Sequence, residues 1–242
     1  MHIRVDLEEV IDKVADAIIN KKPYSVIRLG DGEIDVVNGK VLGFPLWCHP
    51  GNNHCRQSAA PFLVEQTRRA VKESDMIGIF EGDYWTYDAL KAGDCDIEGK
   101  PEFYAFGNLH LCTRKKFVDS VFRNSRVALV GLSMPKYNEL VKSKIPNAKT
   151  IVYGGDCMIY TKQEYDGIVN FLRINVDNYD VVLVSLGVWS ESVVAEAKRL
   201  GAVAIDFGHA ADHQLIGEYP LNLQYNDIEE YYKNSKCPQC LK

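Results

Sequence analysis

Short apolar segments alternate with amphipathic segments along most of the chain. The clearest apolar segment contains Val181-Val182-Leu183-Val184, and such an unbroken run is typical of a strand buried on both faces. The segments predicted as core strands are Tyr24–Leu29, Met76–Phe80, Arg126–Leu132, Thr150–Tyr153, Tyr179–Leu186 and Val203–Asp206. Because helical patterns separate them, we expect an α/β fold: a Rossmann-like domain with a mostly parallel sheet and helices on both faces.

The length and composition indicate one globular domain. The chain has 242 residues, of which 46% are hydrophobic, so we expect a single domain with its core over residues 6–209 and a covering segment over 210–242. The net charge of −5 argues against general binding to nucleic acid. The first residues are too acidic for a secretory signal, and no apolar run approaches the roughly 18 residues of a membrane span, so a cytoplasmic protein is predicted.

Glycines, acids and a histidine follow the predicted strands. The carboxyl ends of parallel strands meet at one edge of a sheet, where α/β proteins bind ligands, so these turns predict a ligand-binding enzyme. One of them, Ser185-Leu186-Gly187, precedes a predicted helix and offers backbone N–H groups to a phosphate. The turns are Gly30–Glu33, Glu81–Asp83, Gly131, Gly154–Asp156, Ser185–Gly187 and Asp206–His209.

The first turn carries the strongest chemical signal. Asp31 and Glu33 stand two residues apart, and Arg28 precedes them. Two neighbouring carboxylates repel each other unless a cation or a proton lies between them, and Gly30 and Gly32 allow a ligand to approach the backbone closely. This pattern predicts a loop that holds a divalent metal and its bound phosphates. A plain Gly-Asp-Gly turn, with Glu33 in the first turn of a helix, is the competing interpretation.

Several standard motifs are absent from the sequence. There is no G-x-G-x-x-G dinucleotide fingerprint, no P-loop and no G-x-S-x-G nucleophile elbow. A metal-dependent phosphohydrolase or phosphotransferase would also place acids at strand ends, and a nucleotide-sugar-binding protein without turnover would use the same crevice. Both remain alternatives.

Seven cysteines are scattered along the chain, which favours reduced thiols. Cys237 and Cys240 have the spacing of half a zinc site. The loop with Cys48, His49, His54 and Cys55 could supply the other half, but a free or redox-sensitive tail is the favoured interpretation.

Several motifs together resemble the GT-D-fold glycosyltransferase family. Arg28-Leu29-Gly30-Asp31-Gly32-Glu33 is similar to its R-x-G-D-G-E signature, and Asn108 with Thr113-Arg114 matches a central N-x(4)-T-R element. Val184-Ser185-Leu186-Gly187 and Ala204-Ile205-Asp206-Phe207-Gly208-His209 resemble the S-L-G and A-I-D-[IF]-G-H elements of the family's C-terminal half.

The resemblance implies a metal-dependent transfer of a sugar from a nucleotide sugar, typically a UDP-sugar. Asp31 and Glu33 would bind Mn²⁺ or Mg²⁺ and the diphosphate, and Asp31, Glu33 and His209 are the predicted catalytic residues. The general base is left open among Glu33, Asp83, Asp156 and His209. The residues expected to line the donor pocket are Arg28, Gly30, Gly32, Asn108, Arg114, Gly187, Asp206 and His209.

The resemblance also implies a glycan, lipid-linked oligosaccharide or glycoprotein as acceptor. A lipid-linked acceptor would bring peripheral membrane association, and a homo-oligomer is left open. One element departs from the family pattern: residues 131–140 lack the acid, arginine and glycines expected after the third strand, which leaves open a changed or lost activity.

Overall fold

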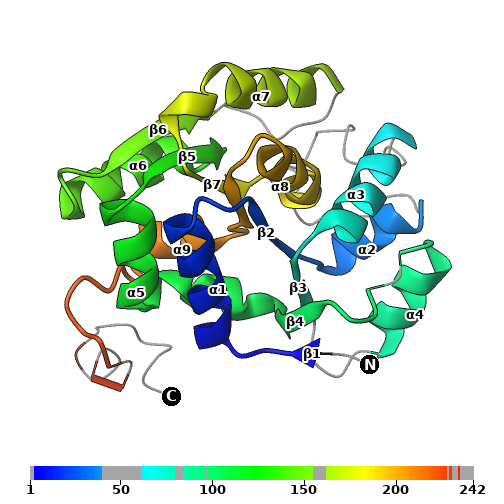
Figure 1. Cartoon of the computed structure of the whole chain (residues 1–242), viewed down its shortest axis with the longest axis horizontal. Helices are drawn as coiled ribbons and strands as arrows, with labels where there is room; N and C mark the ends of the chain where they lie inside the picture. Colours follow the sequence, from blue (N-terminus) through cyan, green and yellow to red (C-terminus); the bar gives the residue numbers. More distant parts are fainter. Residues whose placement is uncertain are drawn as a thin grey trace.

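The computed structural model describes residues 3–39, 61–79, 84–95, 97–154, 162–227, 229–230 and 234. Within these residues, eight strands form one sheet in the order β1-β4-β3-β2-β8-β7-β5-β6, and each neighbouring pair is parallel (Figure 1). The predicted α/β fold with a parallel sheet is confirmed. The strands are β1 Ile3–Arg4, β2 Tyr24–Arg28, β3 Met76–Ile79, β4 Pro101–Tyr104, β5 Arg126–Gly131, β6 Lys149–Tyr153, β7 Val181–Ser185 and β8 Val203–Asp206.

Helices cover both faces of the sheet because alternate side chains of each strand point to opposite sides. On β5, Ala128 and Val130 join one buried cluster, while Val127 and Leu129 join the other. One face packs against α2 Asp31–Val37, α3 Pro61–Glu73, α4 Tyr84–Ala92, α7 Lys162–Ile174 and α8 Ser190–Arg199. The other face packs against α1 Leu7–Ile19, α5 Lys115–Val118, α6 Met134–Lys144 and α9 Ala210–Leu215. In Figure 1, α8 is drawn on one side of β2 and α1 on the other.

The order of the strands reverses direction between β2 and β8. From β2 the chain adds β3 and then β4 on one side, whereas β8, β7, β5 and β6 extend the sheet on the other. Ligands of open α/β sheets bind at such a switch point, outside the carboxyl ends of the strands. The fold therefore places the ends of β2 and β8, and the turns after them, at the expected position of a ligand site.

The stretch 84–104 differs from its prediction. The sequence suggests an irregular, aromatic segment, but the structure forms helix α4 and strand β4 there. β4 is four residues long and begins with Pro101, so it lacks the apolar run that identifies the central strands. Its Glu102 is buried at 1% exposure, and the Tyr87 hydroxyl donates a hydrogen bond to its carboxylate over 2.5 Å.

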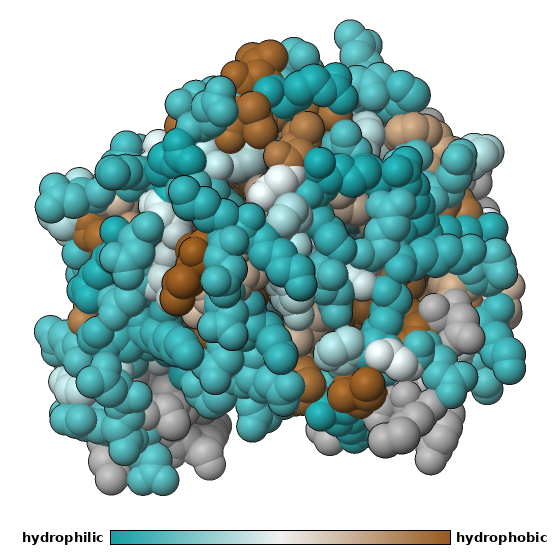
Figure 2. All heavy atoms as spheres, in the orientation of Figure 1, coloured by the Kyte–Doolittle hydropathy of each residue, from teal (hydrophilic) through white to brown (hydrophobic). Residues whose placement is uncertain are grey.

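The surface seen in Figure 2 is mostly hydrophilic, with small separate hydrophobic areas. Among the helices of the described residues, none combines the length and apolar character needed to cross a membrane.

Candidate functional site

Arg28 and Asp206 meet at the switch point. The two residues end β2 and β8, which pair in parallel with Val26 opposite Ile205. Arg28 Nε lies 3.7 Å from Asp206 Oδ2, and the side chains are 13% and 1% exposed. Burial raises the pKa of Asp206, while the Arg28 guanidinium acts in the opposite direction. The pair places a cation and an acid side by side at the sheet edge where the ligand site is predicted.

The side chain of Glu33, in the first turn of α2, points back toward the residues that precede this helix. Gly30 precedes α2, and its N–H donates a hydrogen bond to Glu33 Oε2 over 2.8 Å. The Glu33 side chain is buried, which raises its pKa, and Arg28 partly offsets this shift. A Cβ on Gly30 would lie 3.5 Å from Arg28 Nη1, so loop, acid and guanidinium are neighbours. Asp31 begins α2, but its side chain lies outside the described part of the structure.

Asn108 brings a buried side-chain amide to this site from a segment that is distant in sequence from both strands. It belongs to the 3₁₀ helix η2 Ala105–Thr113 and is 2% exposed, and among the described residues neither its Oδ1 nor its Nδ2 has a hydrogen-bond partner. A Cβ on Gly208 would lie 2.6 Å from Asn108 Nδ2 and 3.3 Å from Arg28 Nε. Buried amides are normally satisfied, so an amide held this way is ready to bind a ligand. Gly208 also donates its N–H to Asp206 Oδ1 over 2.9 Å.

Glu191 is a member of the cluster that sequence reasoning missed. It lies in the first turn of α8 and is 0% exposed, and Glu33, Asp206 and Arg28 all act on its carboxyl. Burial, followed by the two neighbouring acids, raises its pKa well above the usual range. One signal was available: Glu191 is the single charged residue in the run from Leu186 to Ala195. We call Arg28, Glu33, Asn108, Glu191 and Asp206 the switch-point cluster.

Gly187 lies at the same edge of the sheet, in the turn after β7. The preceding turn is fixed by Ser185 Oγ, which donates to the carbonyl of Gly208 over 2.5 Å, and by the Leu186 N–H, which donates to Ser190 Oγ over 3.0 Å. Gly187 itself has a φ of +56°. These bonds tie the turn after β7 to the turn after β8.

His209 follows the cluster and faces outward. Its side chain is half exposed, and its Nδ1 lies 3.2 Å from Asp212 Oδ2. Ser133 Oγ donates to the other Asp212 oxygen. The bond to His209 is the main reason why the pKa of Asp212 is lowered. The divergent stretch 131–140 thus contributes Ser133 to the support of His209.

Arg114 is held by other partners. Its Nε donates to the Glu8 carboxylate, and its Nη1 donates to Thr113 Oγ1 over 2.8 Å. The structure therefore brings together Arg28, Gly30, Asn108 and Asp206 of the predicted donor-pocket residues with Glu33 of the predicted metal site, and it ties Arg114 to the start of α1. The roles of Arg114, Gly32 and Gly187 in ligand binding stay predictions.

Other candidate residues lie outside the described part of the structure. These are Asp83, Asp156, and the cysteines and histidines of the suggested zinc site, namely Cys48, His49, His54, Cys55, Cys237 and Cys240. Within the described residues, no three His, Cys, Asp or Glu side chains are arranged to hold a metal ion. A metal site here would combine the Asp31 side chain, Glu33 and oxygens of the ligand. Mg²⁺ suits this arrangement, because it commonly binds through one or two carboxylates and substrate phosphates.

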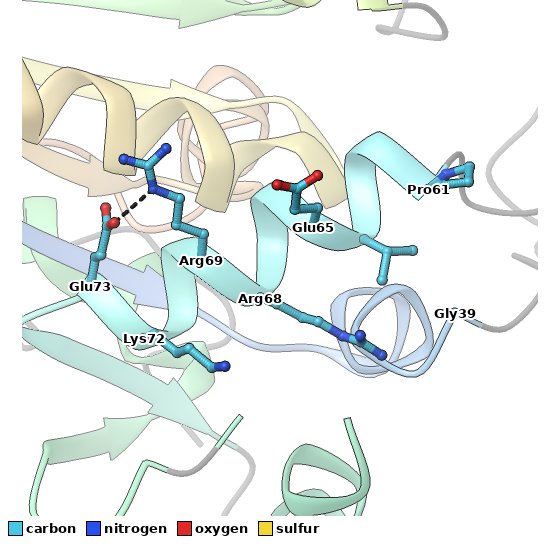
Figure 3. A pocket seen from close by; sticks show the side chains of 8 residues that line it. Gly39, Pro61, Glu65, Arg68, Arg69, Lys72 and Glu73 are labelled. Atoms are coloured by element: carbon cyan, nitrogen blue, oxygen red, sulfur yellow. Dashed lines mark hydrogen bonds and ion pairs between the residues drawn. The ribbon is translucent and has the colours of Figure 1, made fainter. Parts of the chain in front are cut away.

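A hollow of about 670 Å³ lies along α3 (Figure 3). Arg68, Arg69 and Lys72 line it, but each has a partner: Arg68 Nε donates to the carbonyl of Val37 over 2.8 Å, Arg69 Nε to Glu73 over 2.7 Å, and Lys72 Nζ to Asp94 over 2.9 Å. The switch-point cluster, with its unsatisfied amide, is the better candidate for a ligand site.

Comparisons with known proteins identify the family of the chain. The chain matches the GT-D-like family, described as a GT-D fold-like domain, over residues 5–214. No curated protein sequence matches it.

Solved structures resemble the fold at low sequence identity. A selenomethionine-substituted structure of domain of unknown function 1792 has a TM-score of 0.60 and 17% identity, over 97% of this chain and 90% of the other. A second, described as a highly conserved domain with a distinct glycosyltransferase fold, has a TM-score of 0.59 and 16% identity, over 95% of this chain and 93% of the other. A third, described as a new glycosyltransferase from Streptococcus sanguinis, has a TM-score of 0.55 and 16% identity, over 100% of this chain and 97% of the other. Because the family match spans residues 5–214, the chain belongs to the GT-D-like family and has its glycosyltransferase-type fold.

Proposed function

We propose that the protein is a metal-dependent glycosyltransferase that moves a hexose from a UDP-sugar to a glycan, a lipid-linked oligosaccharide or a glycoprotein. The observation that carries the proposal is that the guanidinium of Arg28, 13% exposed, lies beside the Asn108 amide at the switch point, and that this amide has no hydrogen-bond partner among the described residues. Two similar structures of the same fold are described as a glycosyltransferase fold and as a glycosyltransferase.

Each group has a chemical role in this proposal. Arg28 gives charge-assisted hydrogen bonds to the diphosphate, and the Asn108 amide, which can donate and accept, binds a polar group of the donor. Asp31 and Glu33 hold the metal ion, Mn²⁺ or Mg²⁺. When bound, such an ion offsets the negative charge that builds up on the leaving nucleoside diphosphate.

His209 is the best-placed general base among the described candidates. Glu33 is buried and already accepts the Gly30 N–H, whereas His209 is half exposed and its ring is oriented by Asp212. A base must reach the acceptor hydroxyl, and the half-exposed imidazole of His209 is accessible to it. We therefore assign proton removal from the acceptor to His209 and the positioning of the ring to Asp212.

The first test is stabilisation by ligands. We expect UDP or one UDP-sugar with Mn²⁺ to raise the Tm of the purified protein, because a ligand that binds only the folded state stabilises it. Chelation of the metal should abolish the shift. Asp31→Asn should abolish it as well, since it removes a metal-binding charge while keeping the size of the side chain. The measurement is thermal unfolding against a panel of nucleoside diphosphates and nucleotide sugars.

Three outcomes separate the proposal from its alternatives. Slow hydrolysis of the stabilising UDP-sugar supports a transferase. Release of phosphate from generic esters would indicate a phosphohydrolase, and binding without any turnover would indicate a non-catalytic relative. A folded wild-type protein that no nucleotide stabilises would overturn the proposal.

A further inference from the structure

Tyr104 and Phe106 form an exposed aromatic pair to which the proposed reaction gives no role. Their side chains are 50% and 42% exposed, and within the part of the chain whose burial is described every other aromatic side chain is more buried. The ring centroids lie 5.7 Å apart at an interplanar angle of 74°, so the two rings meet edge to face. Single exposed apolar side chains are common, whereas two aromatic rings in contact on the surface indicate a candidate recognition site.

Buried neighbours hold the aromatic pair in place. Along the chain, Phe103 and Ala105 are buried, so the exposed rings alternate with residues anchored in the core. Gly78 on β3 leaves room for the Phe103 ring, since a Cβ on Gly78 would lie 2.8 Å from Phe103 Cζ. Tyr104 ends β4, and Phe106 lies in the first turn of η2. The two rings therefore stand on a strand end and a helix start whose backbone is fixed by core packing.

The aromatic pair lies at the same edge of the sheet as the switch-point cluster. β3 pairs with both β2 and β4, so Arg28 at the end of β2 and Tyr104 at the end of β4 are two strand spacings apart (Figure 1). Neighbouring strands lie about 4.8 Å apart, which places the two backbones roughly 10 Å from each other. On η2, Phe106 precedes Asn108 by two residues, or roughly 4 Å along the helix axis. The rings thus stand within the length of one nucleotide from the groups assigned to the donor.

We propose that Tyr104 and Phe106 bind the base of the nucleotide donor by stacking. This inference rests on the proposed function, because Arg28 has to hold the diphosphate of the same ligand. In a nucleoside diphosphate, the ribose and the α-phosphate separate the base from the terminal phosphate by a distance of the same order as that between Tyr104 and Arg28. Bases stack on aromatic side chains whatever their identity, because every base has a π face. The aromatic pair therefore supplies affinity for the nucleoside, and the choice among bases depends on other groups.

Leucine variants remove the rings and keep apolar side chains. In titrations of UDP with Mg²⁺, we expect Tyr104→Leu and Phe106→Leu each to bind at least about fivefold more weakly than the wild type, whereas Tyr104→Phe keeps the ring and should stay within about twofold. Inorganic pyrophosphate with Mg²⁺ has no base, so its affinity should be the same in all these proteins. Ile174→Ala is the control, because this side chain is 70% exposed at the end of α7 and its loss should leave UDP affinity unchanged.

A second measurement reports the stacking itself. In proton NMR spectra of UDP with the wild-type protein, the ring currents of the aromatic pair should shift the resonances of the uracil ring protons upfield. This shift should be lost in the variant that carries both leucines. A shift that persists without the two rings would place the base elsewhere and overturn the inference.

The outcomes separate this inference from the proposed function. UDP affinity equal to that of the wild type in both leucine variants would overturn the stacking role and leave the proposed function standing. An equal loss for UDP and for pyrophosphate would also overturn it, because the rings would then act on the diphosphate site. Leucine variants that keep UDP affinity but lose self-association in sedimentation would assign the aromatic pair to a contact between copies of the chain. A wild type that binds neither UDP nor pyrophosphate would overturn the proposed function, and the stacking of the base with it.

Discussion

Arg28→Ala is expected to lower the free energy of unfolding by about 3–5 kcal/mol, because it leaves buried acids without their cation. Arg28 faces Asp206 at 3.7 Å, and its charge also favours the ionised forms of Glu33 and Glu191. Removing it should raise the pKa of all three acids further. The stability loss should therefore be large at neutral pH and shrink as pH falls toward the ordinary carboxyl range, where the acids become protonated. Urea denaturation at several pH values measures both effects.

Arg114→Ala is the matched control for this variant. Arg114 pairs with Glu8, whose side chain is 57% exposed, and exposed ion pairs contribute only about 0–1 kcal/mol. The control should unfold at nearly the wild-type urea concentration, with little dependence on pH. If Arg28→Ala lost no more stability than Arg114→Ala, Arg28 would not be compensating the buried acids. In the UDP assay, Arg28→Ala should fail to bind, and Arg28→Lys should recover only part of the affinity, because lysine cannot form a bidentate bond.

The central strands were predictable because they are apolar runs flanked by turn residues. The predicted strand Val203–Asp206 matches β8, and the predicted strand Tyr24–Leu29 exceeds β2 by one residue. Parallel pairing then places Arg28 and Asp206 at one edge, so a large part of the cluster could be located from strand ends alone. The strand β4 could not be predicted in this way, because the burial of its Glu102 depends on a hydrogen bond from Tyr87 on another element.

The hydrogen bonds and the raised carboxyl pKa values of the switch-point cluster could not be predicted from the sequence. Asp31 and Glu33 alternate as a metal-binding pair would, but the structure shows that Glu33 caps its own loop through the Gly30 N–H. Nothing in local sequence indicates that Asp206 on β8 acts on the carboxyl of Glu191, in the first turn of α8, or that Asn108 lies against Gly208. These contacts join segments that are distant in sequence, and burial then sets which carboxyls are raised in pKa.

Gly208→Ala should destabilise the protein by about 2–5 kcal/mol. Gly208 has a φ of +50°, in the left-handed region where a side chain costs about 1–2 kcal/mol. Its added Cβ would lie 2.6 Å from Asn108 Nδ2 and 3.3 Å from Arg28 Nε, and overpacking of this kind costs about 1–3 kcal/mol more. The atoms that must move are the two proposed donor-binding groups, so the affinity for UDP should fall at least tenfold in the same variant.

Two control glycines separate the backbone effect from the contact. Gly187 has a φ of +56°, and its added Cβ would meet nothing within 4 Å, so Gly187→Ala should cost only about 1–2 kcal/mol. Gly217, with a φ of +83° and equally open space, lies outside the cluster, so Gly217→Ala should leave UDP affinity unchanged. Urea denaturation compares Gly208→Ala with Gly187→Ala, and UDP titration compares Gly208→Ala with Gly217→Ala.

Equal stability losses in Gly208→Ala and Gly187→Ala would mean that Asn108 and Arg28 move to accommodate the methyl group. A UDP affinity retained in Gly208→Ala would place the donor elsewhere on the sheet edge. A loss of affinity confined to Gly208→Ala would instead tie donor binding to the contact between the β8 turn, η2 and the end of β2.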